Sequence, residues 1–169
     1  STLNEDPDLV NEVKIIYGQF KLLFELIKKH DHCPGQISLY INISSNFFFE
    51  IAKLRAIRKI WAHLSKDHKT VPELIIHTSD NTQTKLKDNP YNNLISNTLE
   101  AMSAIIGGCN IISLSYYDQK KNKPNEKARK LSQNISHILK NESFIDFVKD
   151  PGAGSYYIES LTKSFITNA

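Results

Sequence analysis

A run of alternating apolar and polar residues, followed at once by an amphipathic helix, limits the fold most strongly. From Ile37 to Ile43 every second residue is apolar, which is typical of a strand with one buried face. From the capping residues Ser44–Asn46 to about His63, apolar residues recur at helical spacing. The predicted apolar face of this helix is Phe47, Ile51, Leu54, Ile57, Trp61 and Leu64, and Lys53, Arg55, Arg58 and Lys59 are predicted mostly on its solvated side.

The same strand and helix unit is predicted twice more. Leu74–Ile76 is predicted as a short strand, and a polar loop follows from Thr78 to Asn89. Pro90 begins a second helix, which Gly107 and Gly108 end because glycine suits a left-handed backbone. Its residues predicted to face inward are Leu94, Ile95, Leu99, Met102, Ile105 and Ile106. The third unit is predicted as a strand over 109–114 and a helix over 128–139.

One further helix is predicted at each end of this repeat. Asp6 can cap the first, with Pro7 at its first position, and the last begins at about Ser155 after the turn 151–154. Asp150 and that turn are predicted to serve the backbone rather than chemistry. Strands that alternate with helices predict an α/β fold with a parallel sheet, here as a single domain. A sheet of three or four strands has open edges, which predicts a partner chain or self-association.

Composition excludes several classes of function. The 169 residues fall short of the roughly 250 of a complete eight-fold barrel. The net charge of +3 is spread along the chain, which argues against nucleic-acid binding, and no apolar run is long enough for a membrane span. Cys33 and Cys109 form neither a disulfide framework nor a metal motif. The polar, acidic first residues do not resemble a secretory signal, so we expect a cytoplasmic protein.

Three blocks of the chain carry a family resemblance. Residues 46–62 read NFFFEIAKLRAIRKIWA, residues 89–94 read NPYNNL, and residues 150–162 read DPGAGSYYIESLT. Together with Glu100-Ala101-Met102 and Gly107-Gly108, they resemble cobalamin-dependent methylmalonyl-CoA mutases, in the order of that family. The resemblance implies a parallel-stranded partial TIM-type barrel, with residues 1–169 as the C-terminal half of a methylmalonyl-CoA mutase-like (β/α)₈ barrel. In the family, acyl-CoA threads through the barrel, and adenosylcobalamin supplies the radical for the exchange of methylmalonyl-CoA and succinyl-CoA.

The segments expected to touch ligand depart from the family. Where active members typically read Arg-Thr-His-x-Gln-Thr-Ser-Gly-Trp-Ser, residues 75–84 keep only His77. Ile75 replaces a guanidinium suited to the phosphates of CoA. In the third strand, Asn110 replaces a glutamine and Ser113 a histidine. The family's cobalamin-ligand motif, Asp-x-His-x-x-Gly, is also missing, because His30 stands where the string His32–Gly35 would need the aspartate.

These departures predict a chain with no catalytic residues and no metal site of its own. The candidate substrate-binding residues are His77, Thr78, Ser79, Tyr91, Asn110 and Ser113, each of which has a purely structural role as the alternative. We expect part of the small subunit of a heterodimeric mutase, whose large catalytic chain binds adenosylcobalamin. A directly participating acyl-CoA mutase and a stand-alone acyl-CoA-binding module are the alternatives.

Overall fold

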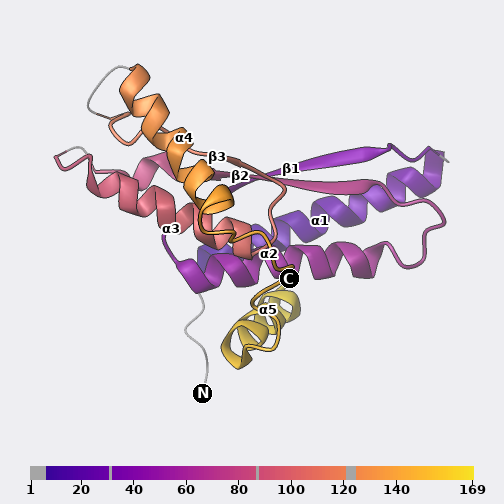
Figure 1. Cartoon of the computed structure of the whole chain (residues 1–169). Helices are drawn as coiled ribbons and strands as arrows, with labels where there is room; N and C mark the ends of the chain where they lie inside the picture. Colours follow the sequence, from indigo (N-terminus) through magenta and orange to yellow (C-terminus); the bar gives the residue numbers. More distant parts are fainter. Residues whose placement is uncertain (1–6, 31, 87, 121–124) are drawn as a thin grey trace.

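The computed structural model describes residues 7–30, 32–86, 88–120 and 125–169, and over these residues the chain forms three strands, five α-helices and one 3-10 turn (Figure 1). In chain order they are α1 (Pro7–His30), β1 (Gln36–Ile43), α2 (Phe47–Leu64), β2 (Glu73–Asp80), η1 (Thr82–Thr84), α3 (Asn92–Ile106), β3 (Ile111–Ser113), α4 (Glu126–Asn141) and α5 (Tyr156–Asn168). The three predicted strand and helix units are therefore confirmed, with a helix before and after them. The predicted cap Asp6 lies outside the described residues.

The sheet is parallel and has the order β1-β2-β3. β2 is longer than predicted, because it continues past Ile76 to Asp80, so Thr78 and Ser79 belong to a strand and not to a loop. β3 is shorter than the predicted 109–114. Just before β3, the side-chain Oδ1 of Asn110 accepts from the Ile76 backbone N–H at 2.9 Å, so a side chain replaces a backbone carbonyl at the start of the pairing with β2. Over the described residues the sheet does not close on itself.

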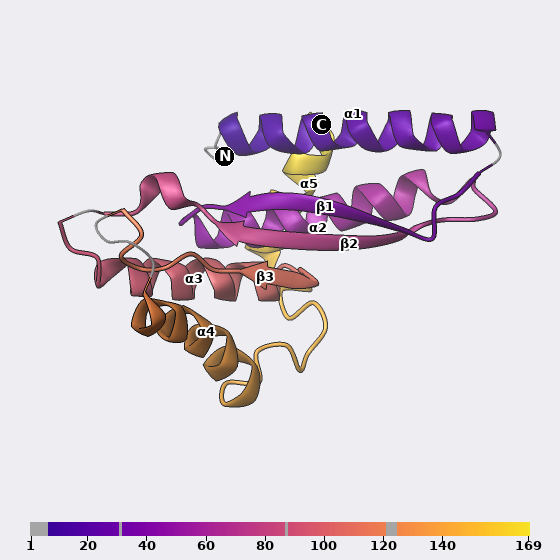
Figure 2. The same cartoon turned by 90° about the horizontal axis from the view of Figure 1, so that it is seen from above.

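Helices cover one face of the sheet and leave the other bare (Figures 1 and 2). Along β2 the buried residues Leu74, Ile76, Thr78 and Asp80 alternate with more exposed ones, so this strand has a two-residue period although it was predicted only as a short apolar run. On the covered side, the aromatic rings of Phe20 and Phe24 of α1 lie 4.8 and 5.0 Å from that of Trp61. The apolar core thus lies between α1, α2 and the sheet.

Helix α2 is buried on nearly every side, and this corrects the prediction that its cations are mostly solvated. Lys53 is 0% exposed and Arg55 5%. Lys53 Nζ lies 2.7 Å from Glu50 and 2.8 Å from Glu12 of α1. Arg55 donates to the Asp150 carboxylate at 2.7 Å and to Glu159 of α5 at 2.5 Å. The prediction failed because α1 and α5 cover the two flanks of α2, and sequence periodicity does not reveal those contacts.

Helix α3 also differs from its predicted face. Ile95 and Leu99 were predicted to point inward but are 64% and 43% exposed, whereas Asn93, Asn97 and Glu100 are buried. The buried polar groups bind the loops after β2 and β3: Asn93 Nδ2 donates to the Tyr117 carbonyl, and Asn97 Nδ2 to the Ser115 carbonyl. The remaining predicted positions, Leu94, Met102, Ile105 and Ile106, are half-buried. Buried carbonyl groups of the loop backbone need hydrogen-bond donors, and this need explains why polar residues occupy the buried face of α3.

Two turns require unusual backbone angles. Gly108 has a φ of 89°, as predicted for the glycine pair after α3. In the turn before α5, Gly154 has a φ of 81°, and Asp150 has a φ of 50° although it carries a side chain. Asp150 is not only a backbone residue, because its carboxylate also receives both Nε and Nη2 of Arg55. This bidentate pair holds the turn against α2.

The buried cation of α2 generates a stability prediction. Lys53→Met leaves the fully buried carboxylate of Glu50 without its partner, so we expect the free energy of unfolding in urea to fall by about 3 kcal/mol or more. Lys59→Met on the same helix, whose side chain is 50% exposed, should cost less than about 1 kcal/mol. The double variant Glu50→Gln/Lys53→Met should recover much of the loss. A single Lys53→Met variant as stable as the parent chain would contradict the assigned ion pair.

The second prediction concerns the stability of the chain at acid pH. Hydrogen bonds from Arg55, and then from Lys59, lower the pKa of Glu159 from 4.5 to about 2. The folded pKa lies below the unfolded one, so this contribution is complete above pH 4.5 and is lost as the pH falls towards 2. Glu159→Gln should flatten the decline of unfolding free energy across that window. The free energy of unfolding can be measured with urea at several pH values. If it falls with pH equally steeply in Glu159→Gln and in the parent chain, this role of Glu159 is ruled out.

Candidate functional site on the open face of the sheet

Two rows of side chains cross the uncovered face of the sheet. The strand register aligns Tyr40, His77 and Ile111 in one row, and Asn42, Ser79 and Ser113 in the next. Residues that share a row lie on adjacent strands and on the same face, so their side chains can touch. The register thus brings three of the predicted site residues, His77, Ser79 and Ser113, to one surface.

His77 lies at the centre of this face. Its ring contacts that of Tyr40 in a tilted arrangement, with the ring centroids 4.8 Å apart, and its Nε2 lies 2.8 Å from the Ser113 hydroxyl oxygen. The Ser79 hydroxyl donates to Asn42 Oδ1 at 2.7 Å. Tyr40 and Asn42 were missed by the sequence analysis, although the signal was present, because they are the outward members of the alternating run Ile37–Ile43.

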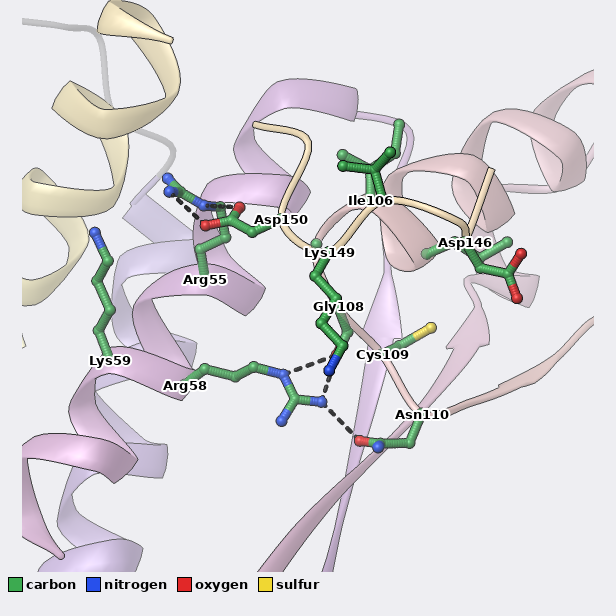
Figure 3. A pocket seen from close by; sticks show the side chains of 13 residues that line it. Arg55, Arg58, Lys59, Ile106, Gly108, Cys109, Asn110, Asp146, Lys149 and Asp150 are labelled. Carbon is green, nitrogen blue, oxygen red and sulfur yellow. Dashed lines mark hydrogen bonds and ion pairs between the residues drawn. The ribbon is translucent and has the colours of Figure 1, made fainter. Parts of the chain in front are cut away.

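The other three predicted site residues lie elsewhere. Thr78 is fully buried on the helix side of β2, where its hydroxyl donates to the Ile111 carbonyl at 3.2 Å. Asn110 precedes β3 and accepts from Arg58 at 2.7 Å, among the helices (Figure 3). Tyr91 is exposed at the start of α3 and stacks on Tyr117, with the ring centroids 5.4 Å apart. The structure does not bring these three to the open face.

A buried ionic group ties down the loop that follows β2. Lys85 lies 2.8 Å from Glu100 of α3 and 3.5 Å from Asp80 at the end of β2. Asp80 also accepts from the backbone N–H and the hydroxyl of Ser115, after β3. Burial raises the pKa of Glu100, although the neighbouring Lys85 opposes the rise. Sequence reasoning missed this group, because it placed Asp80 and Lys85 in a solvated polar loop.

The open face offers neutral hydrogen-bonding groups and one imidazole. Within the two rows, the titratable side chains are those of Tyr40 and His77. Such a surface can hold a polar or thioester-bearing ligand by hydrogen bonds, but its two rows have no lysine or arginine to bind a phosphate or carboxylate. Over the described part of the chain, no three His, Cys, Asp or Glu side chains are grouped to hold a metal ion.

Comparison with known proteins identifies the family. A sequence model for methylmalonyl-CoA mutase matches residues 26–169. This chain belongs to the methylmalonyl-CoA mutase family. It is 34% identical over 143 residues to the methylmalonyl-CoA mutase of Rhizobium meliloti (strain 1021), covering 82% of this chain and 20% of that protein. The mitochondrial methylmalonyl-CoA mutase of Bos taurus is 36% identical over 137 residues, covering 78% of this chain and 18% of that protein.

The chain spans about a fifth of the length of these mutases, and the match lies in their N-terminal part. Among the described residues, no helix is both long and apolar enough to cross a membrane. The cytoplasmic location stays a prediction, since the name of the bovine relative places that protein in mitochondria.

Adenosylcobalamin is the cofactor of the family, but the residues of this chain do not fit it. A ligand histidine in the family's Asp-x-His-x-x-Gly motif would fall on His32, and His30 stands in place of the aspartate. His30 is an exposed residue in the last turn of α1, and Asp31 lies outside the described residues. We therefore derive no cobalamin contact and no radical step for this chain.

The contact between His77 and Ser113 can be tested by nuclear magnetic resonance. Ser113→Ala removes the partner of His77 Nε2, so we expect a change in the ¹⁵N resonances of the His77 ring, which report its tautomer. Ser79→Ala is the matched control, because the Ser79 hydroxyl bonds Asn42 instead. Identical His77 ring signals in Ser113→Ala and the parent chain would show that this hydrogen bond does not form.

Proposed function

We propose that this chain is a non-catalytic part of a methylmalonyl-CoA mutase, comparable to the small subunit of heterodimeric mutases. Residues 1–169 would form one domain, the second half of the substrate barrel, and a large partner chain would carry adenosylcobalamin and the isomerisation. The observation that carries the proposal is the open face of the sheet. It keeps His77 of the family motif but has Ile75 and Ser113 where that motif has a guanidinium and an imidazole.

The loss of these groups bears directly on catalysis. The family's cofactor supplies the radical chemistry, so the protein must position acyl-CoA and exclude water. Ile75 cannot form the paired hydrogen bonds that arginine makes to phosphate, and a serine cannot replace an imidazole in proton transfer at position 113. The loop after β2 lacks the glycine and tryptophan of the family motif, and Lys85 binds it to Asp80 and Glu100. These changes favour a scaffold over an active site.

A second feature supports an incomplete barrel. β1 is an outer strand of the sheet, and beside it α1 exposes the apolar side chains of Ile15, Leu22 and Leu26. Their spacing puts all three on one side of the helix. Lys21 and Lys28, in contrast, line a groove with His63 and Leu64 of α2, and helical geometry puts the apolar stripe well away from them. A neighbouring strand and helix could therefore extend the sheet at β1 and cover this stripe.

Affinity capture tests the proposed partner. The tagged chain, added to native extract, is expected to retain a large mutase chain in about equal amount, with the absorbance of cobalamin. Leu22→Asp places a charge on the apolar stripe of α1 and should reduce capture at least about tenfold, which corresponds to 1.4 kcal/mol. Tyr156→Asp, at an exposed aromatic of α5 away from β1, is the matched control and should not reduce capture.

Three other outcomes would reject the proposed subunit. Recovery of the soluble bait as a self-associated species, with no mutase chain, would contradict it. Saturable binding of succinyl-CoA to the isolated chain, with a Kd well below about 1 mM, would favour the stand-alone acyl-CoA-binding module. Turnover that depends on His77 or Ser113 in the reconstituted complex would favour direct participation in the reaction.

A further inference from the structure

A cavity of about 560 Å³ lies among the helices, between the C-terminal half of α2, the end of α3 and the loop before α5 (Figure 3). Ile105, Ile106 and Val148 form an apolar wall, and the basic residues around the cavity are Arg55, Arg58, Lys59 and Lys149. No residue of the two rows on the open sheet face lines it. The cavity is therefore distinct from the surface described above, and an inference from it does not depend on the proposed function.

Arg58 differs from the other arginine of this cavity in its partners. Arg55 is neutralised by Asp150 and Glu159. Arg58 instead donates from Nε to the Gly108 carbonyl at 2.8 Å, and from Nη2 to the same carbonyl and to Asn110 Oδ1. Over the described residues, no carboxylate pairs with Arg58. Half-burial of a guanidinium without a counter-charge is unfavourable, and burial accordingly lowers the pKa of Arg58.

Several donors remain available around this cation. Arg58 donates through Nε and Nη2, so within the described part of the chain Nη1 has no acceptor. In the Asn110 side-chain amide only the oxygen is engaged, by Arg58 and by the Ile76 backbone N–H. Its N–H group therefore also has no acceptor among the described residues. Lys149 lines the cavity and is exposed. A guanidinium, an ammonium and an amide N–H are the groups that commonly bind a phosphate.

The acidic residues of the cavity do not cancel this charge. Asp150 is occupied by the bidentate contact with Arg55, and Lys59 shares Glu159 with Arg55 at 3.1 Å. The carboxylate of Asp146 points away from Arg58 (Figure 3). The donors that have no acceptor among the described residues therefore carry a net positive charge, and they lie beside the apolar wall.

We propose that this cavity binds a small organic phosphate, with its oxygens on Arg58, Lys149 and Asn110 and its apolar body against Ile105, Ile106 and Val148. Phosphate fits better than a carboxylate because it offers oxygens to three donors at once, whereas a carboxylate offers two. The apolar wall selects a ligand with a ring or alkyl group over inorganic phosphate. The site also gives Asn110 a ligand-binding role, although at a different place from the open sheet face.

Phenyl phosphate is a suitable probe for the 169-residue chain. We expect saturable binding with one site per chain by calorimetry, and amide shifts in ¹H–¹⁵N spectra that centre on Gly107, Gly108 and Lys149. Lys149→Gln should weaken binding about tenfold, as loss of one charge-assisted hydrogen bond predicts. Lys163→Gln is the control, since Lys163 is an exposed lysine of α5 outside the cavity, and it should bind as the parent chain does.

Arg58→Gln should weaken binding more than Lys149→Gln does. If Arg58→Gln lowers the chemical-shift dispersion of the spectrum, the variant has lost folded structure. The Lys149→Gln variant then still decides the test, because Lys149 is exposed. No saturation by phenyl phosphate, or equal binding by the parent chain and Lys149→Gln, would overturn the site. Equal affinity for benzoate would overturn the choice of phosphate, and equal affinity for inorganic phosphate would remove the role of the apolar wall.

Discussion

Buried cations on α2 bind carboxylates that come from three other parts of the chain. Lys53 reaches Glu12 of α1, and Arg55 reaches Asp150 in the last loop and Glu159 of α5. A buried charge without its partner costs several kcal/mol, so these pairs require α1 and α5 to lie where they do. Because α2 also packs against the sheet through its apolar residues, the positions of α1, α5 and the sheet are set relative to this one helix.

The order of elements could be predicted from sequence because strand and helix periods differ clearly. The alternating run of β1 and the helix after it were found within a few residues of their observed bounds, although Asn46 forms no side-chain cap at the start of α2. The buried face of α3 could not be found in this way. Its partners are loop carbonyls such as those of Tyr117 and Ser115, so polar residues are buried there and Ile95 is not. Periodicity assumes that a buried face is apolar, and it fails where a helix packs on loops.

The candidate site shows the same limit. His77, Ser79 and Ser113 were recognised from their place in the family motif, and the strand register brings them together. Thr78 was grouped with them, but neighbours in a strand point to opposite faces, and it is buried among the helices. Asn110 was also grouped with them, yet its side chain accepts from the Ile76 backbone N–H in the middle of β2 and from Arg58. Side-chain direction depended on the exact extent of each strand, which the sequence left open.

The ion pairs of Arg55 also bear on the order in which the protein is made. Asp150 follows Arg55 by 95 residues and Glu159 follows it by 104. On the ribosome, α2 is therefore complete long before its counter-charges exist, and the guanidinium must remain in water during that time. The flank of α2 that α5 covers can close only after the residues beyond Lys149 have been released. Helix α5 thus limits how early this part of the nascent chain can complete the packing around α2.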